Sequence, residues 1–129
     1  MKNLRILVVE DVSTMRNFIK ATLESSFRNV FVDVAANGSR AKEMLESESF
    51  DIVLCDWDMP VMRGDELLQW IRETESLKEI SFIMVTGKTQ KDDVLLIKDL
   101  GADGYIVKPV TVGILIGKLA GIRKDLVLA

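Results

Sequence analysis

Five polar side chains stand directly after short apolar runs of the sequence, and together they have the chemistry of a phosphoryl-transfer site. They are Glu10, Asp11, Asp56, Thr86 and Lys108. Carboxylate oxygens are ligands that Mg²⁺ accepts, while an ammonium and a hydroxyl can hold phosphoryl oxygens. Asp56 is the best candidate nucleophile, because a carboxylate at the end of a central strand could attack phosphorus and form an aspartyl phosphate. Each residue alone could be an ordinary loop residue, but five of them at four run ends make coincidence a poor explanation.

The apolar runs that precede these residues are typical of parallel strands buried on both faces of a sheet. The runs are Leu4–Val9, Ile52–Cys55, Phe82–Val85 and Tyr105–Val107. In such a sheet the carboxyl ends of all strands lie along one edge, where ligands bind. We therefore expect the four run ends to meet in one crevice.

The rest of the chain continues the alternation of strands and helices. We expect a second strand at Val30–Ala35 and a fifth at Gly104–Val107. Helical spacing recurs over Met15–Leu23, Ala41–Leu45, Leu67–Ile71 and Val94–Lys98, and a last helix begins near Thr111. Ser13 is placed to cap the first helix, and Asn37-Gly38 turns the chain into the second. Five strands alternating with five helices predict a doubly wound α/β sheet with right-handed crossovers, in one domain over residues 1–129.

The composition excludes several classes of function. The chain has no histidine, so it has no histidine-based nucleophile pair, no zinc site built on imidazole and no phosphohistidine of its own. A net charge of −3 gives no electrostatic reason to bind DNA or an anionic membrane. Cys55 is the only cysteine and is expected to be a buried small hydrophobe in a reduced, cytoplasmic setting. No stretch has the pattern of a signal peptide or of a membrane span.

The sequence resembles the receiver domain of response regulators, and within that family the single-domain chemotaxis type (CheY-like). The resemblance covers essentially the whole chain, and its motifs are specific when taken together. They are Val8–Arg16, Asp56–Pro60, Met84–Gly87 and Gly101–Pro109. The resemblance implies the flavodoxin-like strand order 2-1-3-4-5. It also implies a two-component response regulator, which accepts a phosphoryl group from the phosphohistidine of a sensor histidine kinase.

Carried over residue by residue, the resemblance gives each site residue a role. Asp56 would be the phosphoacceptor. Mg²⁺ would be bound by Glu10, Asp11, Asp56 and the backbone carbonyl of Asp58. Thr86 and Lys108 would hold phosphoryl oxygens, and the peptide bond between Lys108 and Pro109 would be cis.

The resemblance also implies a switch formed by Thr86 and Tyr105. Phosphorylation would draw the Thr86 hydroxyl toward the phosphoryl group, and the aromatic ring would then move inward. The surface formed by the fourth helix, the fifth strand and the fifth helix would change with it. The alternative for Tyr105 is a half-buried strand aromatic without a switching role.

We expect this chemistry to switch a signalling module and not to convert a substrate in repeated turnovers. The protein would not be a conventional enzyme, although it would help to catalyse its own phosphorylation and dephosphorylation. We expect no output domain after the fifth helix, so output passes through a protein such as the flagellar motor switch or a phosphatase. We expect a monomer. The sequence does not distinguish a motor-driving role from a phosphate sink, and it gives neither the kinase nor the phosphoryl lifetime.

Four residues depart from the commonest chemotaxis pattern. Glu10 replaces an aspartate, Asp58 an asparagine and Val110 a phenylalanine, while Lys88 stands two residues after Thr86. We hypothesise that Asp58 and Lys88 pair across the mouth of the pocket and restrict the water that hydrolyses the aspartyl phosphate. The alternative is two solvated charges, since most exposed pairs contribute ~0–1 kcal/mol.

The last helix carries glycines at four-residue spacing, at Gly113, Gly117 and Gly121. Our preferred interpretation is close packing against the sheet or the first helix. The alternative is a groove for a partner helix or a dimer contact. An apolar tail, Leu126–Leu128, could cover part of such a groove.

Two other classes share some of these features. Asp56-Trp57-Asp58 has the Asp-x-Asp form of aspartate-nucleophile phosphohydrolases. That motif belongs after the first strand, however, and the acidic pair at Glu10 and Asp11 would then be unexplained. A flavodoxin-like cofactor binder shares the sheet, but the loop after the first strand lacks a glycine-containing phosphate cradle.

Overall fold

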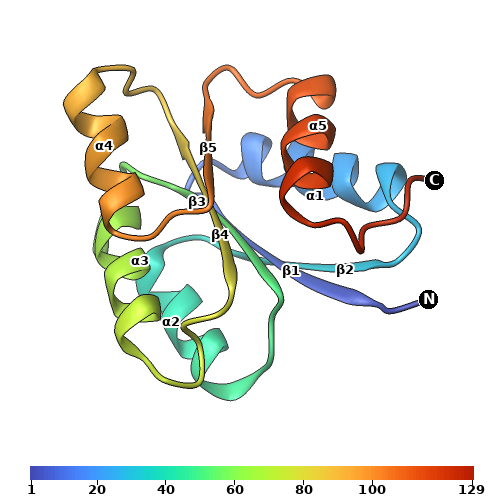
Figure 1. Cartoon of the computed structure of the whole chain (residues 1–129), viewed down its shortest axis with the longest axis horizontal. Helices are drawn as coiled ribbons and strands as arrows, with labels where there is room; N and C mark the ends of the chain where they lie inside the picture. Colours follow the sequence, from blue (N-terminus) through green and yellow to red (C-terminus); the bar gives the residue numbers. More distant parts are fainter.

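A five-stranded parallel sheet forms the centre of the molecule, as the computed structural model of residues 1–129 shows (Figure 1). Its strands are β1 (Leu4–Val9), β2 (Val30–Ala35), β3 (Ile52–Asp56), β4 (Ser81–Thr86) and β5 (Gly104–Val107). They lie in the order β2-β1-β3-β4-β5, and every neighbouring pair is parallel. The predicted fold class and strand order are therefore confirmed.

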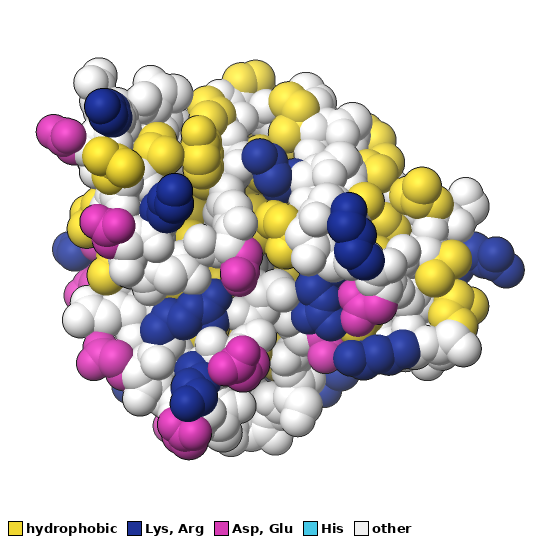
Figure 2. Space-filling model, in the orientation of Figure 1, with side chains coloured by type: hydrophobic (Ala, Val, Ile, Leu, Met, Phe, Trp, Pro, Cys, Tyr) yellow, Lys and Arg dark blue, Asp and Glu magenta, His cyan; other side chains and the backbone are white.

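Helices cover both faces of this sheet. They are α1 (Ser13–Ser26), α2 (Gly38–Ser47), α3 (Gly64–Glu73), α4 (Lys91–Asp99) and α5 (Val112–Ile122). Helices α1 and α5 lie on one face, and α2, α3 and α4 lie on the other (Figure 1). In the same view, Figure 2 shows most of the apolar side chains in the upper part of the molecule, around α4 and α5, with charged side chains among them over α4 and further ones below. None of the helices combines the length and the apolar character needed to cross a bilayer.

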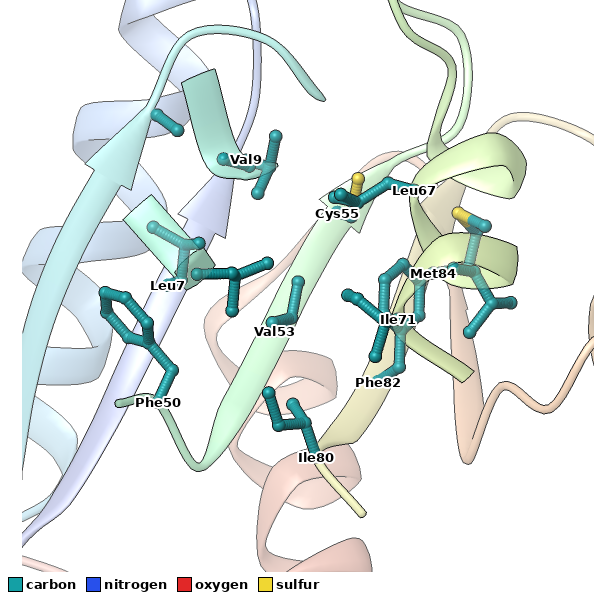
Figure 3. Close-up of a cluster of buried hydrophobic side chains, with 14 of the residues drawn as sticks. Leu7, Val9, Phe50, Val53, Cys55, Leu67, Ile71, Ile80, Phe82 and Met84 are labelled. Atoms are coloured by element: carbon teal, nitrogen blue, oxygen red, sulfur yellow. The ribbon is translucent and has the colours of Figure 1, made fainter. Parts of the chain in front are cut away.

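The sheet separates two hydrophobic cores because successive side chains of a strand point to opposite faces. Along β1, Leu7 and Val9 enter the core under α2 to α4, while Ile6 and Val8 enter the core under α1 and α5. Figure 3 shows the first of these cores, in which side chains of β1, β3 and β4 meet those of α3. Strand β3 is buried along its whole length. This burial makes the strand a rigid base for the residue at its end, Asp56.

The sequence predicted how three of the helices begin, and the structure agrees at α2 and α5 but not at α1. Helix α2 begins at Gly38, within the predicted turn, and the side chain of Asn37 caps it by accepting a hydrogen bond from the Arg40 N–H at 2.8 Å. Ser13 does not cap α1: it is the first helical residue, and the N-cap position is Val12, which makes no side-chain cap bond. The Val12 N–H instead donates to the Glu10 carboxylate at 3.1 Å, which starts the turn one residue earlier.

The glycines of α5 do not pack closely, so the preferred interpretation of their spacing is wrong. A Cβ atom added at Gly113, Gly117 or Gly121 would meet no other atom within 4 Å. The face that these residues share is turned to solvent, because Leu115 and Leu119 occupy the buried side of the helix.

The C-terminal tail lies elsewhere, so it does not cover this stripe. Leu128 forms an antiparallel bridge with Phe27 after α1, and the Arg28 N–H donates to the Val127 carbonyl at 2.8 Å. The buried Asn29 side chain also donates to the Asp125 carbonyl at 2.9 Å. The tail therefore closes the end of α1 instead of the surface of α5.

Candidate functional site

Three carboxylates converge at the carboxyl edge of the sheet. One oxygen each from Glu10, Asp11 and Asp56 lies within 4.8 Å of the other two. Glu10 and Asp11 follow β1, and Asp56 ends the neighbouring strand β3, which explains why residues far apart in sequence meet here. Glu10 and Asp56 are buried, at 1% and 5% exposure, whereas Asp11 is exposed. The predicted crevice is present, with one acid at its rim and two at its floor.

Lys108 supplies the positive charge of the crevice. Its Nζ lies 3.0 Å from an Asp56 carboxylate oxygen and 3.7 Å from Glu10 Oε1. The residue follows β5, and its N–H donates to the Thr86 carbonyl at 2.8 Å, which fixes the start of the loop against β4. The bond between Lys108 and Pro109 is cis, as expected. The ammonium therefore sits where it can hold an anion bound at Asp56.

Thr86 ends β4 and is buried, at 1% exposure. Its hydroxyl oxygen accepts a hydrogen bond from the Lys88 N–H at 2.9 Å, within the loop that follows the strand. A threonine hydroxyl both accepts and donates, so its proton is still available for a further acceptor.

Tyr105 lies in β5, beside Met84 of β4, and packs partly against the core under α2 to α4. The ring is half-buried, and the Lys118 ammonium lies 5.6 Å from its centre. Neither a switching role nor a purely structural role is decided by this position, so the role of Tyr105 stays a prediction.

The acids perturb one another because they are buried together. Burial raises the pKa of Glu10 to about 7, and the neighbouring charge of Asp56 acts in the same direction. Burial also raises the pKa of Asp56, although the hydrogen bond and charge of Lys108 oppose that rise. Burial lowers the pKa of Lys108, but the hydrogen bond and the charge of Asp56 outweigh this effect, so the pKa of Lys108 is raised. One ammonium does not neutralise three carboxylates, so the crevice favours an added cation.

A divalent cation fits the oxygen atoms of this crevice. Glu10 Oε1 is buried and has no hydrogen-bond partner, which is costly unless a ligand satisfies it. The other oxygen, Oε2, already accepts the Val12 N–H. A free buried carboxylate oxygen beside two further carboxylates is a set of hard donors that suits Mg²⁺. The contribution of the Asp58 backbone carbonyl stays a prediction.

Asp58 and Lys88 form the pair that their positions suggested. The Lys88 ammonium lies 3.8 Å from an Asp58 carboxylate oxygen and 5.3 Å from the centre of the Trp57 ring. The Asp58 and Lys88 side chains are 66% and 37% exposed, so the pair lies in contact with water. The effect of this pair on hydrolysis of the aspartyl phosphate stays a prediction.

Two features near the site were missed by the sequence reasoning. The Arg16 guanidinium donates to the Glu10 backbone carbonyl at 2.9 Å, a contact across six residues that no periodic pattern signals. Val61, in the loop after β3, has φ of 74° and is 82% exposed. A valine in the left-handed region is unusual, and only a family-specific turn type could have suggested it.

Comparison with known proteins agrees with this geometry. A family model described as the response regulator receiver domain matches residues 6–120. Chemotaxis protein CheY-3 of Vibrio cholerae is 40% identical over 119 residues, which cover 92% of this chain and 90% of that protein. Chemotaxis protein CheY of Pseudomonas aeruginosa is 39% identical over 117 residues, covering 90% of this chain and 93% of that one. The solved structure of response regulator CheY4 of Vibrio cholerae has a TM-score of 0.88 at 28% identity, covering 95% of this chain and all of that one.

The fold and the acidic crevice define a receiver of two-component signalling. The chain belongs to the response regulator receiver domain family. Its similarity to chemotaxis proteins over most of its length makes it a CheY-like member of that family and indicates two-component signalling of the chemotaxis type. The phosphohydrolase alternative is not favoured, because Asp56 ends the third strand along the chain and the family match accounts for Glu10 and Asp11.

Proposed function

We propose that Asp56 accepts a phosphoryl group from the phosphohistidine of a partner histidine kinase. Glu10, Asp11, Asp56 and the backbone carbonyl of Asp58 hold Mg²⁺ for this step. The observation that carries the proposal is the 3.0 Å contact between Lys108 and Asp56 inside a cluster of three acids. An ammonium against the acceptor and a free buried carboxylate oxygen beside it support phosphoryl transfer rather than a structural ion pair.

The chain's own residues account for most of the transfer chemistry. An Asp56 oxygen forms a bond to phosphorus while the P–N bond of the phosphohistidine breaks, and the imidazole leaves with the electron pair. The Lys108 ammonium stays within reach of one oxygen of the incoming phosphoryl group. The Thr86 hydroxyl donates a hydrogen bond to a second phosphoryl oxygen while it still accepts one from the Lys88 N–H. Bound Mg²⁺ supplies neutralisation of the phosphoryl charge.

The protein then acts as a signal and not as an enzyme with a turned-over substrate. The same crevice serves hydrolysis of the aspartyl phosphate, in which water replaces Asp56 on phosphorus. In this proposal residues 1–129 work as one receiver domain, as a monomer in the cytoplasm. The Cys55 thiol is compatible with this setting, because burial and then the nearby Asp56 charge raise its pKa and keep it protonated.

We place the output on the surface formed by α4, β5 and α5. A hollow of about 640 Å³ lies there, with Tyr105 in its wall. Gly117 and Gly121 line it from α5, and the missing side chains leave it open. The exposed Lys98 and Lys118 also line it. An apolar hollow flanked by lysines supports docking of a downstream protein, such as the flagellar motor switch or a phosphatase.

Intact mass after incubation with Mg²⁺ and acetyl phosphate tests the chemistry. One phosphoryl increment is expected on the wild-type chain, with none when Mg²⁺ is chelated and none in Asp56→Asn. An increment that persists in Asp56→Asn would place the acceptor elsewhere. Rapid acid quenching at several times keeps a short-lived aspartyl phosphate visible, so its absence at every time would contradict the proposal.

A further inference from the structure

We infer that Arg16 is a positioning residue, which orients Glu10 so that its free oxygen can bind Mg²⁺. This inference rests on the magnesium site proposed above. It adds to that site a residue that touches neither the cation nor the phosphoryl group.

Glu10 is held at every polar atom except one. Its N–H donates to the Ala35 carbonyl at 3.0 Å, and its own carbonyl accepts from Arg16 Nη1 at 2.9 Å. Its carboxylate Oε2 accepts from the Val12 N–H at 3.1 Å. Only Oε1 is left without a hydrogen bond, and it is buried. The bonds around Glu10 therefore select which oxygen faces the other acids.

Arg16 closes the turn that carries Glu10. Its main-chain N–H donates to the Val12 carbonyl at 2.9 Å, while its guanidinium reaches back to the Glu10 carbonyl. Helix α1 has no side-chain cap and no acidic residue in its first turn, so its first turn is tied to Glu10 by two hydrogen bonds, one from the Val12 N–H and one from the Arg16 guanidinium. A hydrogen bond from a charged donor is stronger than one between neutral groups. Arg16 is thus the only side chain of α1 that donates a hydrogen bond to the end of β1.

Removal of Arg16 has opposite effects through position and through charge. A nearby guanidinium repels a cation, so loss of its charge alone would strengthen binding of any divalent ion. Loss of position affects Mg²⁺ more than Ca²⁺, because Mg²⁺ demands near-ideal geometry and Ca²⁺ accepts flexible sites. We expect the positional effect to dominate, since Arg16 is only half-buried and water screens its charge.

The experiment is isothermal titration calorimetry with Mg²⁺ alone and with Ca²⁺ alone. For Arg16→Met we expect the Mg²⁺ dissociation constant to rise about tenfold, equal to ~1.4 kcal/mol. The Ca²⁺ constant should change less than about threefold. Arg16→Lys keeps a charged donor of similar reach and should restore Mg²⁺ affinity to within about threefold of wild type. Arg40→Met is the matched control, because Arg40 also lies in the first turn of a helix and its guanidinium pairs only with Glu43.

Each other outcome overturns the inference. An equal loss for both cations would mean general loosening of the turn, and a gain for both would mean that only the charge matters. Unchanged constants would show that Arg16 has no part in the site. Arg16→Gln gives the same comparison if Arg16→Met does not fold. A wild-type chain that binds no Mg²⁺ would refute the magnesium site itself and the inference with it, which is a distinguishable failure.

Discussion

The ion pair between Asp56 and Lys108 should stabilise the metal-free protein measurably, and a double-mutant cycle can isolate its contribution. The two charged atoms are 3.0 Å apart, and the side chains are 6% and 32% exposed. At an effective dielectric constant near 20, two such charges attract by ~5 kcal/mol. Contact of the lysine with water and the desolvation of both groups reduce the net value. We therefore expect a coupling free energy of ~1.5–3 kcal/mol, close to that of a charged hydrogen bond.

The single variants should change stability in opposite directions. Lys108→Met leaves Asp56 and Glu10 buried without a cation, so it should lower the free energy of unfolding. Asp56→Asn removes one charge from the three-acid cluster, so it should raise that free energy. In the double variant Lys108→Met should cost much less than it does in the wild-type background.

Urea unfolding at pH 8, with a chelator present, measures all four proteins under conditions in which the carboxylates carry most charge. Saturating Mg²⁺ in a parallel series should shrink the stabilising effect of Asp56→Asn, because the cation relieves the same repulsion. A coupling free energy below ~0.5 kcal/mol would refute the reasoning. So would a stability loss in Asp56→Asn without metal.

Three further predictions concern the surroundings of the crevice. Lys88→Ala should speed loss of the phosphoryl group, by up to ~fivefold since an exposed pair contributes at most about 1 kcal/mol. Decay of the intact-mass increment measures this, with the unpaired Lys91→Ala as control; equal rates would remove the proposed gate. Val61→Asn should raise the free energy of unfolding by ~1 kcal/mol, because asparagine tolerates the φ of 74° and the lost valine is 82% exposed. Val61→Ala, which keeps a Cβ in the same backbone conformation, should gain less in the same denaturation assay. Burial raises the pKa of the Glu10 carboxyl from 4.5 to about 7, so the folded chain binds that proton more tightly than the unfolded chain and loses stability as pH rises between these values. The loss is on the order of 3 kcal/mol without metal, and a difference between wild type and Glu10→Gln that stays flat from pH 4.5 to 8 would contradict it.

The strands could be predicted closely because a polar residue ends four of the five strand-like runs at one edge of the sheet. Val30–Ala35 and Gly104–Val107 have the predicted bounds. The run before Asp56 differs only in that Asp56 closes β3, whereas β4 extends the run Phe82–Val85 by one residue at each end, Ser81 and Thr86. The crevice followed from this, since parallel strands bring their carboxyl ends together regardless of sequence separation.

Two features could not be predicted from the sequence. One is a side chain that folds back onto the backbone, and the other is the direction in which a helix face points, which residue spacing alone does not give. The cap of α1 was assigned to Ser13 because serine is a common cap, yet the Glu10 carboxylate takes the Val12 N–H first. The spacing of the α5 glycines showed that they share one face of the helix. It did not show that this face is turned to solvent.

The position of the hollow between α4, β5 and α5 gives the proposed switch of Thr86 and Tyr105 a physical basis. Thr86 lies opposite Val107, and Met84 lies opposite Tyr105, so the site hydroxyl and the aromatic ring belong to adjacent strands two residues apart. Strand β3 is buried throughout and cannot yield, whereas β5 is a half-buried edge strand with open space beside it. A switch needs two positions of the Tyr105 ring, and the outer position needs free space. The absence of side chains at Gly117 and Gly121 leaves that space. A long side chain at either glycine, which would fill the hollow beside Tyr105, should therefore bias the ring, and with it the output surface, without touching the phosphoryl site; alanine, whose Cβ meets no atom within 4 Å, should not.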